Sequence, residues 1–426
     1  MSDLAPEGWR LFKLNEVVEP RSSNVDKKSY TGDRAVRLCN YTDVYYNNRI
    51  TRHIAFMEAT AKDKEIERFS LEFDDVIITK DSETPDDIAI PSYVSETLHG
   101  VVCGYHLTLL RPYKDKVSGE YLAHLLQLPD TQHYFYILAN GITRFGLTAD
   151  AIASAPIVLP PLLEQQKIAK ILTSVDEVIE KTQAQIDKLK DLKTGMMQEL
   201  LTQGVGVDGK PHTEFKDSPV GRIPKAWEVK CLGEIFPKIV VGYVGNVNDY
   251  YCDSGEGVPF YRTLNIRDGY IRHEPIKYVT RAFNDKNKKS QISNDDILIA
   301  RVGANLGMTC KVTGLSTPAN IANAIIIKAK KGISSGFFSE FIRSQLGQAQ
   351  IQLGAAGGAQ GVFNTGLAQG LIVPVPSHEE QKNIEAVLKS IDEKINKVQL
   401  YLERKVNLKK GLMQDLLTGK VRVAID

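Results

Sequence analysis

The most regular pattern of apolar and polar positions occurs twice in the chain, at residues 157–205 and 372–421. In each copy, spacings of four and three residues alternate, and eight of the ten positions in this series are apolar. Such a series is typical of a coiled-coil seam. Each copy therefore predicts one long helix whose narrow apolar face is covered by another helix.

The predicted helices are long enough to act as spacers. The first runs from Glu164 to Leu201, which is 38 residues or about 57 Å at 1.5 Å per residue, whereas globular helices average about 11–12 residues. Prolines precede both copies, and carboxylates in the first turn suit a helix N-terminus. An ordinary core helix is the alternative. The seam residues that we expect at the helix and subunit interface are Leu172, Val175, Ile179, Ile186, Leu189, Leu388, Ile391, Ile395 and Leu402, and we expect Leu172, Ile179, Ile186, Ile391, Ile395 and Leu402 to be buried.

The two copies can be aligned with each other. Gln166 and Lys167 match Gln381 and Lys382 at an offset of 215, and after an inserted residue the offset becomes 216. Many identical residues then share that register up to the matching threonines, Thr202 and Thr418. Such identity indicates a tandem duplication.

The regions before the helices repeat one plan as well. Trp9 matches Trp227, and the pairs at 74–75 and 118–119 match those at 295–296 and 335–336. In the first region we expect strands at 35–38, 75–79 and 104–110 and a helix around 121–128. Short strands with one or two helices predict an α+β (mixed α/β) fold. We expect two homologous globular domains, 1–157 and 206–371, each followed by a helical segment, 158–205 and 372–426. The two helices can pack antiparallel and give the chain approximate two-fold symmetry.

Composition narrows the classes of protein. A chain of 426 residues is too long for one ordinary core. No secretory signal and no run of 18 apolar residues occurs, so we expect a cytoplasmic protein without a membrane segment. The five cysteines form no C-x-x-C pair, which argues against a zinc site. The net charge is +1; a protein that binds DNA alone is usually more basic, so base contacts or partner subunits would have to supply affinity.

A search for catalytic motifs predicts neither a catalytic residue nor a metal ligand. The glycines at 204–209 follow a helix rather than a strand, and the glycine-rich stretch at 354–361 lacks the Lys-Ser/Thr of a phosphate-binding loop. Glu228 and Lys230 resemble the end of a nuclease E-x-K motif, but no acidic partner precedes them at a suitable spacing. The eight histidines do not cluster.

Polar and aromatic residues lie in the loops that follow the expected strands. Arginine can pair with guanine, and asparagine or glutamine with adenine, through two hydrogen bonds, while lysine and arginine also hold phosphates. A solvated, turn-rich surface and neutral drift of the loops are the alternatives. The candidate DNA contacts are Arg37, Asn40, Tyr41, Tyr45, Lys80, Asp81, Thr84, Arg144 and Phe145 in the first region, and Tyr261, Arg262, Asn265, Arg267, Arg301, Asn305 and Gln360 in the second.

Two variable domains, each followed by a long helix, resemble the DNA specificity subunit of Type I restriction–modification systems. The resemblance covers the whole chain. It is carried by P-P-x-x-E-Q-x-K or P-x-x-E-E-Q-K at the start of each helix and by G-(M/L)-M-Q-(E/D)-L-L-T at its end. The glycine-bearing ARVGANLG at 300–307 also resembles the family's second domain, whereas TKDSETPDD at 79–87 departs from the family pattern.

The resemblance implies that each globular region is a target recognition domain that reads one half of a bipartite site in double-stranded DNA. It implies that two methylase subunits dock around the helices and methylate adenine with S-adenosylmethionine. Two restriction subunits, which use ATP and Mg, can join them. The chain itself would be non-catalytic and hold no cofactor. A coiled-coil scaffold with two protein-binding domains, and a single-chain enzyme with an unrecognised site, are the alternatives.

Overall fold

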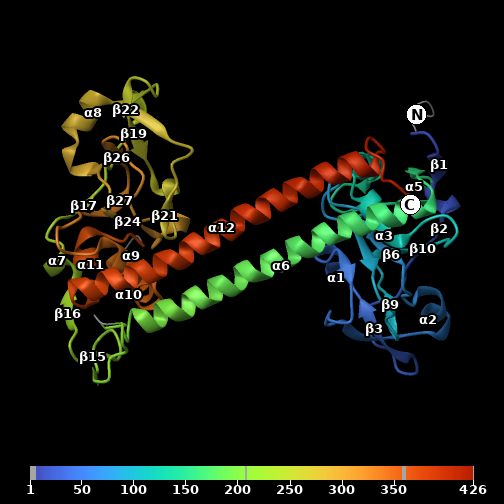
Figure 1. Cartoon of the computed structure of the whole chain (residues 1–426), viewed down its shortest axis with the longest axis horizontal. Coiled ribbons are helices and arrows are strands. Elements are labelled where there is room, and N and C mark those ends of the chain that lie inside the picture. Colours follow the sequence, from blue (N-terminus) through green and yellow to red (C-terminus); the bar gives the residue numbers. More distant parts are fainter. Residues whose placement is uncertain (1–5, 207–208, 357–360, 426) are drawn as a thin grey trace. The chain divides into compact units, whose positions relative to one another are not determined.

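The computed structural model describes residues 6–206, 209–356 and 361–425 (Figure 1). The chain divides into two compact units, of which unit 1 comprises residues 1–183 and 400–426 and unit 2 comprises residues 184–399. The long helices α6 (Leu162–Leu200) and α12 (His378–Leu417) contribute residues to both units. Among the described residues, no helix has the length and apolar character needed to cross a membrane.

Unit 1 contains mixed sheets and short helices. Its five-stranded sheet has the order β2 (Val18–Ser22), β10 (Leu107–Pro112), β6 (Val76–Thr79), β8 (Pro91–Val94) and β4 (Arg49–Ile50). A second sheet has the order β5 (Met57–Ala61), β3 (Arg34–Cys39) and β9 (Val101–Cys103), and a third has the order β11 (Asn140–Gly141), β12 (Phe145–Gly146) and β7 (Asp81–Ser82). β1 (Arg10–Lys13) pairs with β13 (Pro156–Leu159). The helices are η2 (Leu14–Glu16), α1 (Tyr41–Tyr45), α2 (Asp63–Phe69), α3 (Gly119–Leu126), α4 (Pro129–Leu138) and α5 (Ala149–Ala153).

Unit 2 contains the corresponding sheets. One has the order β17 (Ile239–Val241), β27 (Ala324–Ile327), β24 (Ile297–Ala300) and β25 (Thr309–Lys311). Another has the order β18 (Tyr251–Cys252), β22 (Lys277–Thr280), β19 (Gly257–Tyr261), β26 (Ala319–Ile321) and β23 (Gln291–Ile292). Three two-stranded sheets are β16 (Glu228–Cys231) with β28 (Ile372–Val375), β14 (Phe215–Lys216) with β15 (Ile223–Pro224), and β20 (Ile266–Arg267) with β21 (Tyr270–Ile271). The helices are α7 (Leu232–Ile235), η3 (Asn248–Tyr250), η4 (Thr263–Asn265), α8 (Arg281–Lys286), η5 (Lys288–Ser290), η6 (Gly303–Asn305), α9 (Ser335–Arg343), α10 (Gln345–Ala356) and α11 (Thr365–Gln369).

The apolar runs of the sequence form central strands with a core on each side. In β6, Val76 and Ile78 pack into one apolar core and Ile77 packs into another. In β24, Ile297 and Ile299 pack into one core and Leu298 packs into the other. Successive side chains of a strand point to opposite faces, so a strand that is covered on both faces is apolar throughout.

The two units share one plan, which confirms the predicted α+β fold and its duplication. β3 pairs antiparallel with β5 and parallel with β9, and β19 pairs in the same way with β22 and β26. In both units a buried aspartate beside the central strand pairs with a cation. Asp75 accepts two hydrogen bonds from Arg111 at 2.9 and 3.0 Å, and Asp296 pairs with Lys328 at 2.8 Å.

The helix starts correct the alignment of the two copies. Gln165 accepts from the backbone of Ser118 and donates to the Pro160 carbonyl. Gln381 accepts from the backbone of Ser334 and donates to the Pro376 carbonyl. Gln165 is therefore the equivalent of Gln381, the offset is already 216 at the helix start, and the expected one-residue insertion is wrong.

Each helix begins with a buried glutamate that holds the chain segment following the other long helix. In unit 2, Glu380 accepts hydrogen bonds from the backbone of Val205 and Gly206, from His212 Nε2 at 2.8 Å and from Trp227 Nε1 at 2.9 Å. In unit 1, Glu164 accepts from Arg422 Nε at 2.6 Å and Nη2 at 2.8 Å.

Glycine allows each of these segments to approach closely. Gly204 and Gly419 adopt φ values of 72° and 71° just after α6 and α12. A Cβ on Gly204 would lie 2.6 Å from the Trp227 ring, and one on Gly419 would lie 3.2 Å from the Trp9 ring. A side chain at either position would thus be strained by both backbone and neighbour.

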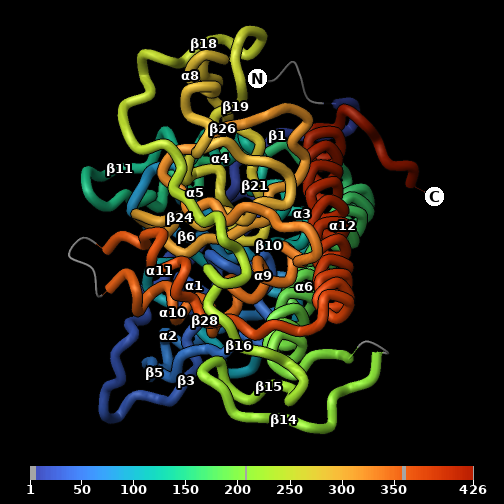
Figure 2. The backbone as a smooth tube through the Cα atoms, turned by 90° about the vertical axis from the view of Figure 1, so that its left-hand side faces the viewer, coloured from blue at the N-terminus to red at the C-terminus, as the bar shows by residue number. Residues whose placement is uncertain are grey.

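Within each unit, α6 and α12 lie side by side and antiparallel (Figure 1 and Figure 2). Lys409 Nζ lies 2.7 Å from Asp176 Oδ1 in unit 1, and Lys193 Nζ lies 2.6 Å from Asp392 Oδ2 in unit 2. The residue numbers of both pairs add up to 585, so one antiparallel register accounts for both. Lys193 and Lys409, two polar residues of the otherwise apolar seam series, therefore form ion pairs with the other helix.

The seam is less uniformly buried than we expect from the sequence. Leu172, Ile186, Leu388, Ile391 and Ile395 are buried. Val175, Ile179, Leu189 and Leu402 are only half-buried, so the expectation of burial for Ile179 and Leu402 is wrong. Two helices alone cover a narrow part of each other's surface. The strands expected at 35–38, 75–79 and 104–110 are β3, β6 and β10, with ends that differ from the expected ones by at most three residues.

Candidate nucleic-acid interface

In unit 1, five of the nine predicted contact residues line a hollow of about 380 Å³. It lies where α1 follows β3 and where β7 follows β6. β12 pairs with β7, with Phe145 opposite Ser82, and this pairing brings the loop before β12 to the same place. The hollow is lined by Tyr41, Tyr45, Asp81, Thr84 and Arg144, which the sequence predicts as contacts, and by Thr42, Tyr46, Ser82, Glu83, Asp87 and His106.

Tyrosines form one wall of this hollow. The rings of Tyr41 and Tyr45 stack with centroids 5.5 Å apart, and Tyr46 packs edge-on against Tyr45. The Tyr45 hydroxyl donates to Asp87 Oδ2 at 2.7 Å, and this hydrogen bond raises the pKa of Tyr45 to about 12. Tyr45 therefore stays protonated at neutral pH, and Tyr46, which is 76% exposed, offers a free aromatic face.

Most cationic groups near the hollow already have partners. Lys80 Nζ lies 3.1 Å from Asp81 Oδ2, and His106 Nδ1 lies 2.9 Å from the same oxygen. Arg37 donates to the His99 carbonyl at 2.6 Å. Arg37, Lys80, Asn40 and Phe145 belong to neighbouring elements but do not line the hollow. The acceptors Glu83 and Asp87 were not predicted, because carboxylates in a turn-rich loop look like ordinary solvated residues.

In unit 2, the predicted contacts lie on three loops that are linked by hydrogen bonds. Asn305 Nδ2, in η6 after β24, donates to the Thr263 carbonyl in η4 after β19 at 3.5 Å. The backbone N–H of Phe363 donates to the carbonyl of Arg301 at 3.0 Å and so joins the segment before α11 to the end of β24. Gln360 lies outside the described residues.

Two predicted contacts of unit 2 are structural instead. Asn265 is fully buried, and its amide donates to the carbonyls of Arg272 and Pro275 and accepts from the backbone N–H of Arg262. Tyr261 is 2% exposed, and its hydroxyl bonds to His273 Nδ1 at 2.8 Å. The assignment of both side chains as DNA contacts is therefore wrong, because their polar atoms hold the loop together.

Three arginines of unit 2 differ from these. Arg262, Arg267 and Arg301 are half-buried. The Nε of each is buried without a hydrogen-bond partner, and none of them pairs with a carboxylate of the described residues. Buried side-chain donors in proteins nearly always have partners. These three guanidinium groups are therefore the strongest candidates for binding an acceptor-rich ligand.

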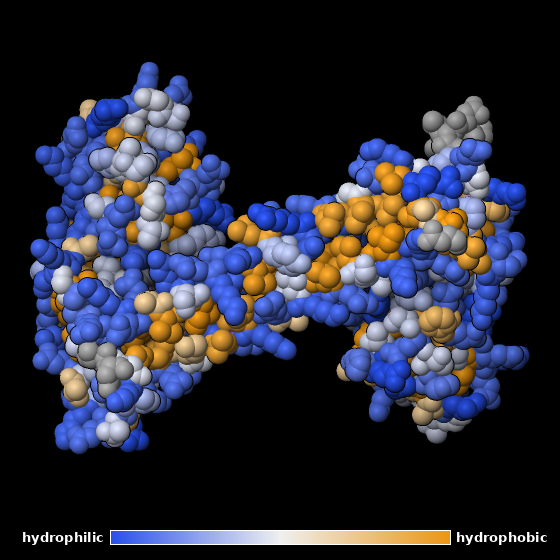
Figure 3. All heavy atoms as spheres, viewed as in Figure 1, coloured by the Kyte–Doolittle hydropathy of each residue, from blue (hydrophilic) through white to orange (hydrophobic). Residues whose placement is uncertain are grey.

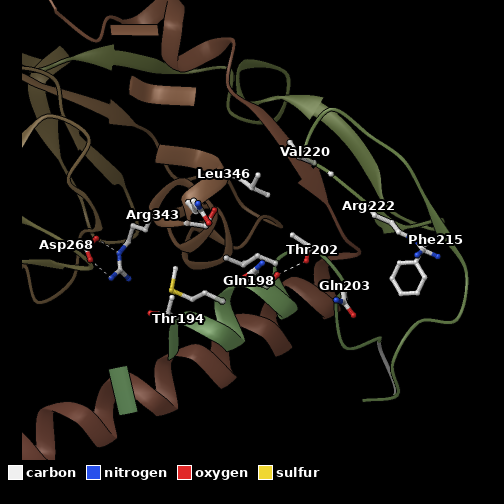
Figure 4. A pocket seen from close by; sticks show the side chains of 15 residues that line it. Thr194, Gln198, Thr202, Gln203, Phe215, Val220, Arg222, Asp268, Arg343 and Leu346 are labelled. Atoms are coloured by element: carbon white, nitrogen blue, oxygen red, sulfur yellow. Dashed lines mark hydrogen bonds and ion pairs between the residues drawn. The ribbon is translucent and has the colours of Figure 1, made fainter. Parts of the chain in front are cut away.

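A larger hollow, of about 620 Å³, lies elsewhere in unit 2 (Figure 4). The end of α6, the β14–β15 hairpin and the junction of α9 and α10 line it. Arg343 points into it but donates to Asp268 at 2.8 and 3.0 Å and to Glu340 at 2.7 Å. Since its charge is thus neutralised and no predicted contact residue lines it, this hollow is not the candidate interface. Within the described ranges, no group of three or more His, Cys, Asp or Glu side chains is placed to hold a metal ion.

The fold and its two loop clusters define a binding protein with two repeated domains carried on paired long helices. Residues 6–191 and 224–403 match the family model described as "Type I restriction modification DNA specificity domain". The chain belongs to this family, and its function is target recognition on DNA within a Type I restriction–modification system.

One relative agrees with this assignment, and two solved structures share the fold. The chain is 32% identical over 317 residues, covering 73% of this chain and 72% of the relative, to the type I restriction enzyme MjaVIII specificity subunit of Methanocaldococcus jannaschii. Its fold is similar to that of the S subunit of a Type I restriction–modification system from M. genitalium, with a TM-score of 0.58, 13% identity and coverage of 98% and 97% of the two chains. It is also similar to a chain from a study of complex assembly in the type I R-M system, with a TM-score of 0.56, 17% identity and coverage of 98% and 99%.

Proposed function

We propose that the chain is a non-catalytic specificity subunit in which each globular domain reads one half of a bipartite site in double-stranded DNA. One observation carries this proposal. The two units share one arrangement of strands and helices, but the residues of their loops differ in chemical character. The hollow of unit 1 is rich in tyrosine and carboxylate, whereas the loops of unit 2 carry unpaired arginines. Homologous domains whose loops differ on a shared frame are suited to different ligands.

The proposal includes two methylase subunits that dock on the long helices. Exposed apolar residues occur along these helices (Figure 3). Leu192 is 51% exposed and its repeat equivalent Leu408 is 47% exposed. Three residues further on, Gly195 and Gly411 occupy equivalent mid-helix positions with open space around each Cα. An exposed glycine inside a helix costs about 1 kcal/mol relative to alanine, and no described residue lies close enough to either position to require it. Two surfaces with these features at equivalent positions support two copies of one partner.

In this assembly the methylase subunits use S-adenosylmethionine to methylate adenine in each half-site. Restriction subunits, where the system has them, join as a pair and use ATP and Mg to translocate and cut DNA. This chain holds none of these cofactors and works in the prokaryotic cytoplasm beside its partners. Its own contribution is to select the site through the loops of its two units.

A domain exchange tests the proposal. The whole chain is co-expressed with its methylase subunit, and methylated adenines are mapped by sequencing. Replacing residues 206–371 with the matching region of a relative should change one half-site and leave the other intact. A change of both half-sites together would refute independent reading by the two domains. Methyl transfer by the purified chain alone would refute its non-catalytic role.

A further inference from the structure

The loops of unit 2 present hydrogen-bond donors that the protein leaves unpaired. Each guanidinium group has five N–H donors and no acceptor. Arg262 follows β19, Arg267 lies in β20 and Arg301 follows β24, and each has a buried Nε without a partner. Buried donors in proteins usually have partners, and a ligand with acceptor atoms would supply them for these three arginines.

The loops that carry these donors are held in place by their own hydrogen bonds. Asn265 fixes the loop after β19 through its bonds to Arg262, Arg272 and Pro275. Asn305 links the loop after β24 to Thr263. The arginines are therefore presented on a fixed frame and are half-buried, whereas arginines that only neutralise phosphates can be exposed and flexible.

The hollow of unit 1 has the opposite chemistry. The Asp81 carboxylate in this hollow already pairs with Lys80 and His106. Two further carboxylates of the lining keep free acceptor capacity, namely Glu83, which is exposed, and Asp87, which accepts one hydrogen bond from Tyr45. Arg144 lines the same hollow and is exposed, so it is available for phosphate.

We propose that the two domains read bases of opposite hydrogen-bonding character. The arginines of unit 2 select guanine, whose N7 and O6 are both acceptors in the major groove, and the carboxylates of unit 1 select an amino group, that of cytosine N4 or adenine N6. This assignment rests on the proposed function, since it takes double-stranded DNA as the ligand. It adds which base chemistry each half-site contains.

Conservative variants of Arg301 test the assignment in the intact complex. The full chain is co-expressed with its methylase subunit, and methylation is measured across all sequence variants of the wild-type site. Arg301→Lys keeps the charge but loses the planar fork that binds guanine through two bonds. We expect it to lower discrimination at one guanine of the unit 2 half-site by about 5- to 150-fold, the range that one such contact supplies. Glu83→Gln should relax one position of the other half-site.

Two internal controls accompany these variants. Arg281 is exposed, at the start of α8 in the same domain, so Arg281→Gln makes a charge change away from the loops and should leave every base preference unchanged. The unit 1 half-site of the Arg301→Lys complex should also remain as strict as in the wild type, which shows that the complex is folded.

The outcomes separate the two proposals. A unit 2 half-site that contains guanine, relaxed there by Arg301→Lys, supports the base assignment. A unit 2 half-site without guanine on either strand overturns it and leaves the proposed function standing. If Arg301→Gln weakens methylation evenly on all sequences while Arg301→Lys does not, Arg301 contacts phosphate. This result also overturns the base assignment and leaves the proposed function standing. Absence of any bipartite methylation by the unchanged complex would refute both.

Discussion

Replacement of Glu380 should weaken unit 2 far more than replacement of its neighbour in the same helical turn. Glu380 is 2% exposed and accepts four hydrogen bonds, from Val205, Gly206, His212 and Trp227. In Glu380→Ala, His212 can turn toward solvent because its side chain is 21% exposed. The other three donors lose their acceptor where water has little access. Each orphaned donor costs about 1–3 kcal/mol.

These costs do not add fully, because the cavity can admit water and the segment can shift. We expect the free energy of unfolding of unit 2 to fall by about 3–5 kcal/mol, the range for breaking a buried charged contact. Glu379→Ala removes the same charge from the same turn at an exposed position, and it should change stability by less than about 0.5 kcal/mol. Hydrogen exchange of the backbone amides of β16 and α7, followed by mass spectrometry, measures both.

A double-mutant cycle isolates the contact between the glutamate and the indole. Glu380→Gln places an amide NH₂ where Oε2 accepts from Trp227 Nε1, so two donors face each other. Trp227→Phe removes one of them. The double variant should therefore be less destabilised than the sum of the single variants, by about 0.5–3 kcal/mol. Additive effects, or equal stabilities of Glu380→Ala and Glu379→Ala, would refute the idea that this carboxylate joins the segment after α6 to α12.

Three further perturbations concern unit 1, whose unfolding can be followed by Trp9 fluorescence in a Trp227→Phe background. Lys409→Met should cost about 3 kcal/mol, because Asp176 would stay buried without its cation, and Asp176→Asn in addition should restore part of the loss. Arg111→Met should cost a similar amount by isolating Asp75, which is 1% exposed; unchanged thermal melting would contradict this. Burial, with Lys409 nearby, lowers the pKa of His124 to about 3. Because the unfolded chain binds that proton near pH 6.5, the stability of unit 1 should be fully present above pH 6.5 and fall as the pH drops towards 3, by up to about 1.4 kcal/mol per pH unit. Urea unfolding at pH 7 and pH 5 should show this slope, and His124→Asn should flatten it.

The periodic parts of the fold could be predicted from the sequence because their pattern follows directly from burial. The seam spacing predicts both long helices, and the apolar runs at 76–78 and 297–299 are central strands with a core on each face. The alignment of the two helix starts with each other was less predictable. The true equivalence of Gln165 with Gln381 depends on hydrogen bonds to Ser118 and Ser334, which lie far away in the sequence.

The candidate interface could be predicted only to the level of loops. Residue type and position after a strand pointed to Tyr41, Thr84 and Arg144, and the structure brings these three side chains around one hollow. The same signal pointed to Asn265, whose amide donates its hydrogen bonds to backbone carbonyls of its own loop. A polar residue that binds a ligand and one that stabilises a turn look alike in a sequence. Only the partners of their hydrogen bonds distinguish them.

The way residues 400–426 complete unit 1 has a consequence for synthesis. Domains generally fold as units, the N-terminal one first, as the ribosome delivers the chain. Here unit 2 is continuous from residue 184 to 399, whereas unit 1 needs residues 400–426. The buried Glu164 meets its partner Arg422 only after residue 422 has been made. The domain that is translated first is therefore finished last, and a chain that stops early would carry a complete unit 2 beside an open core in unit 1.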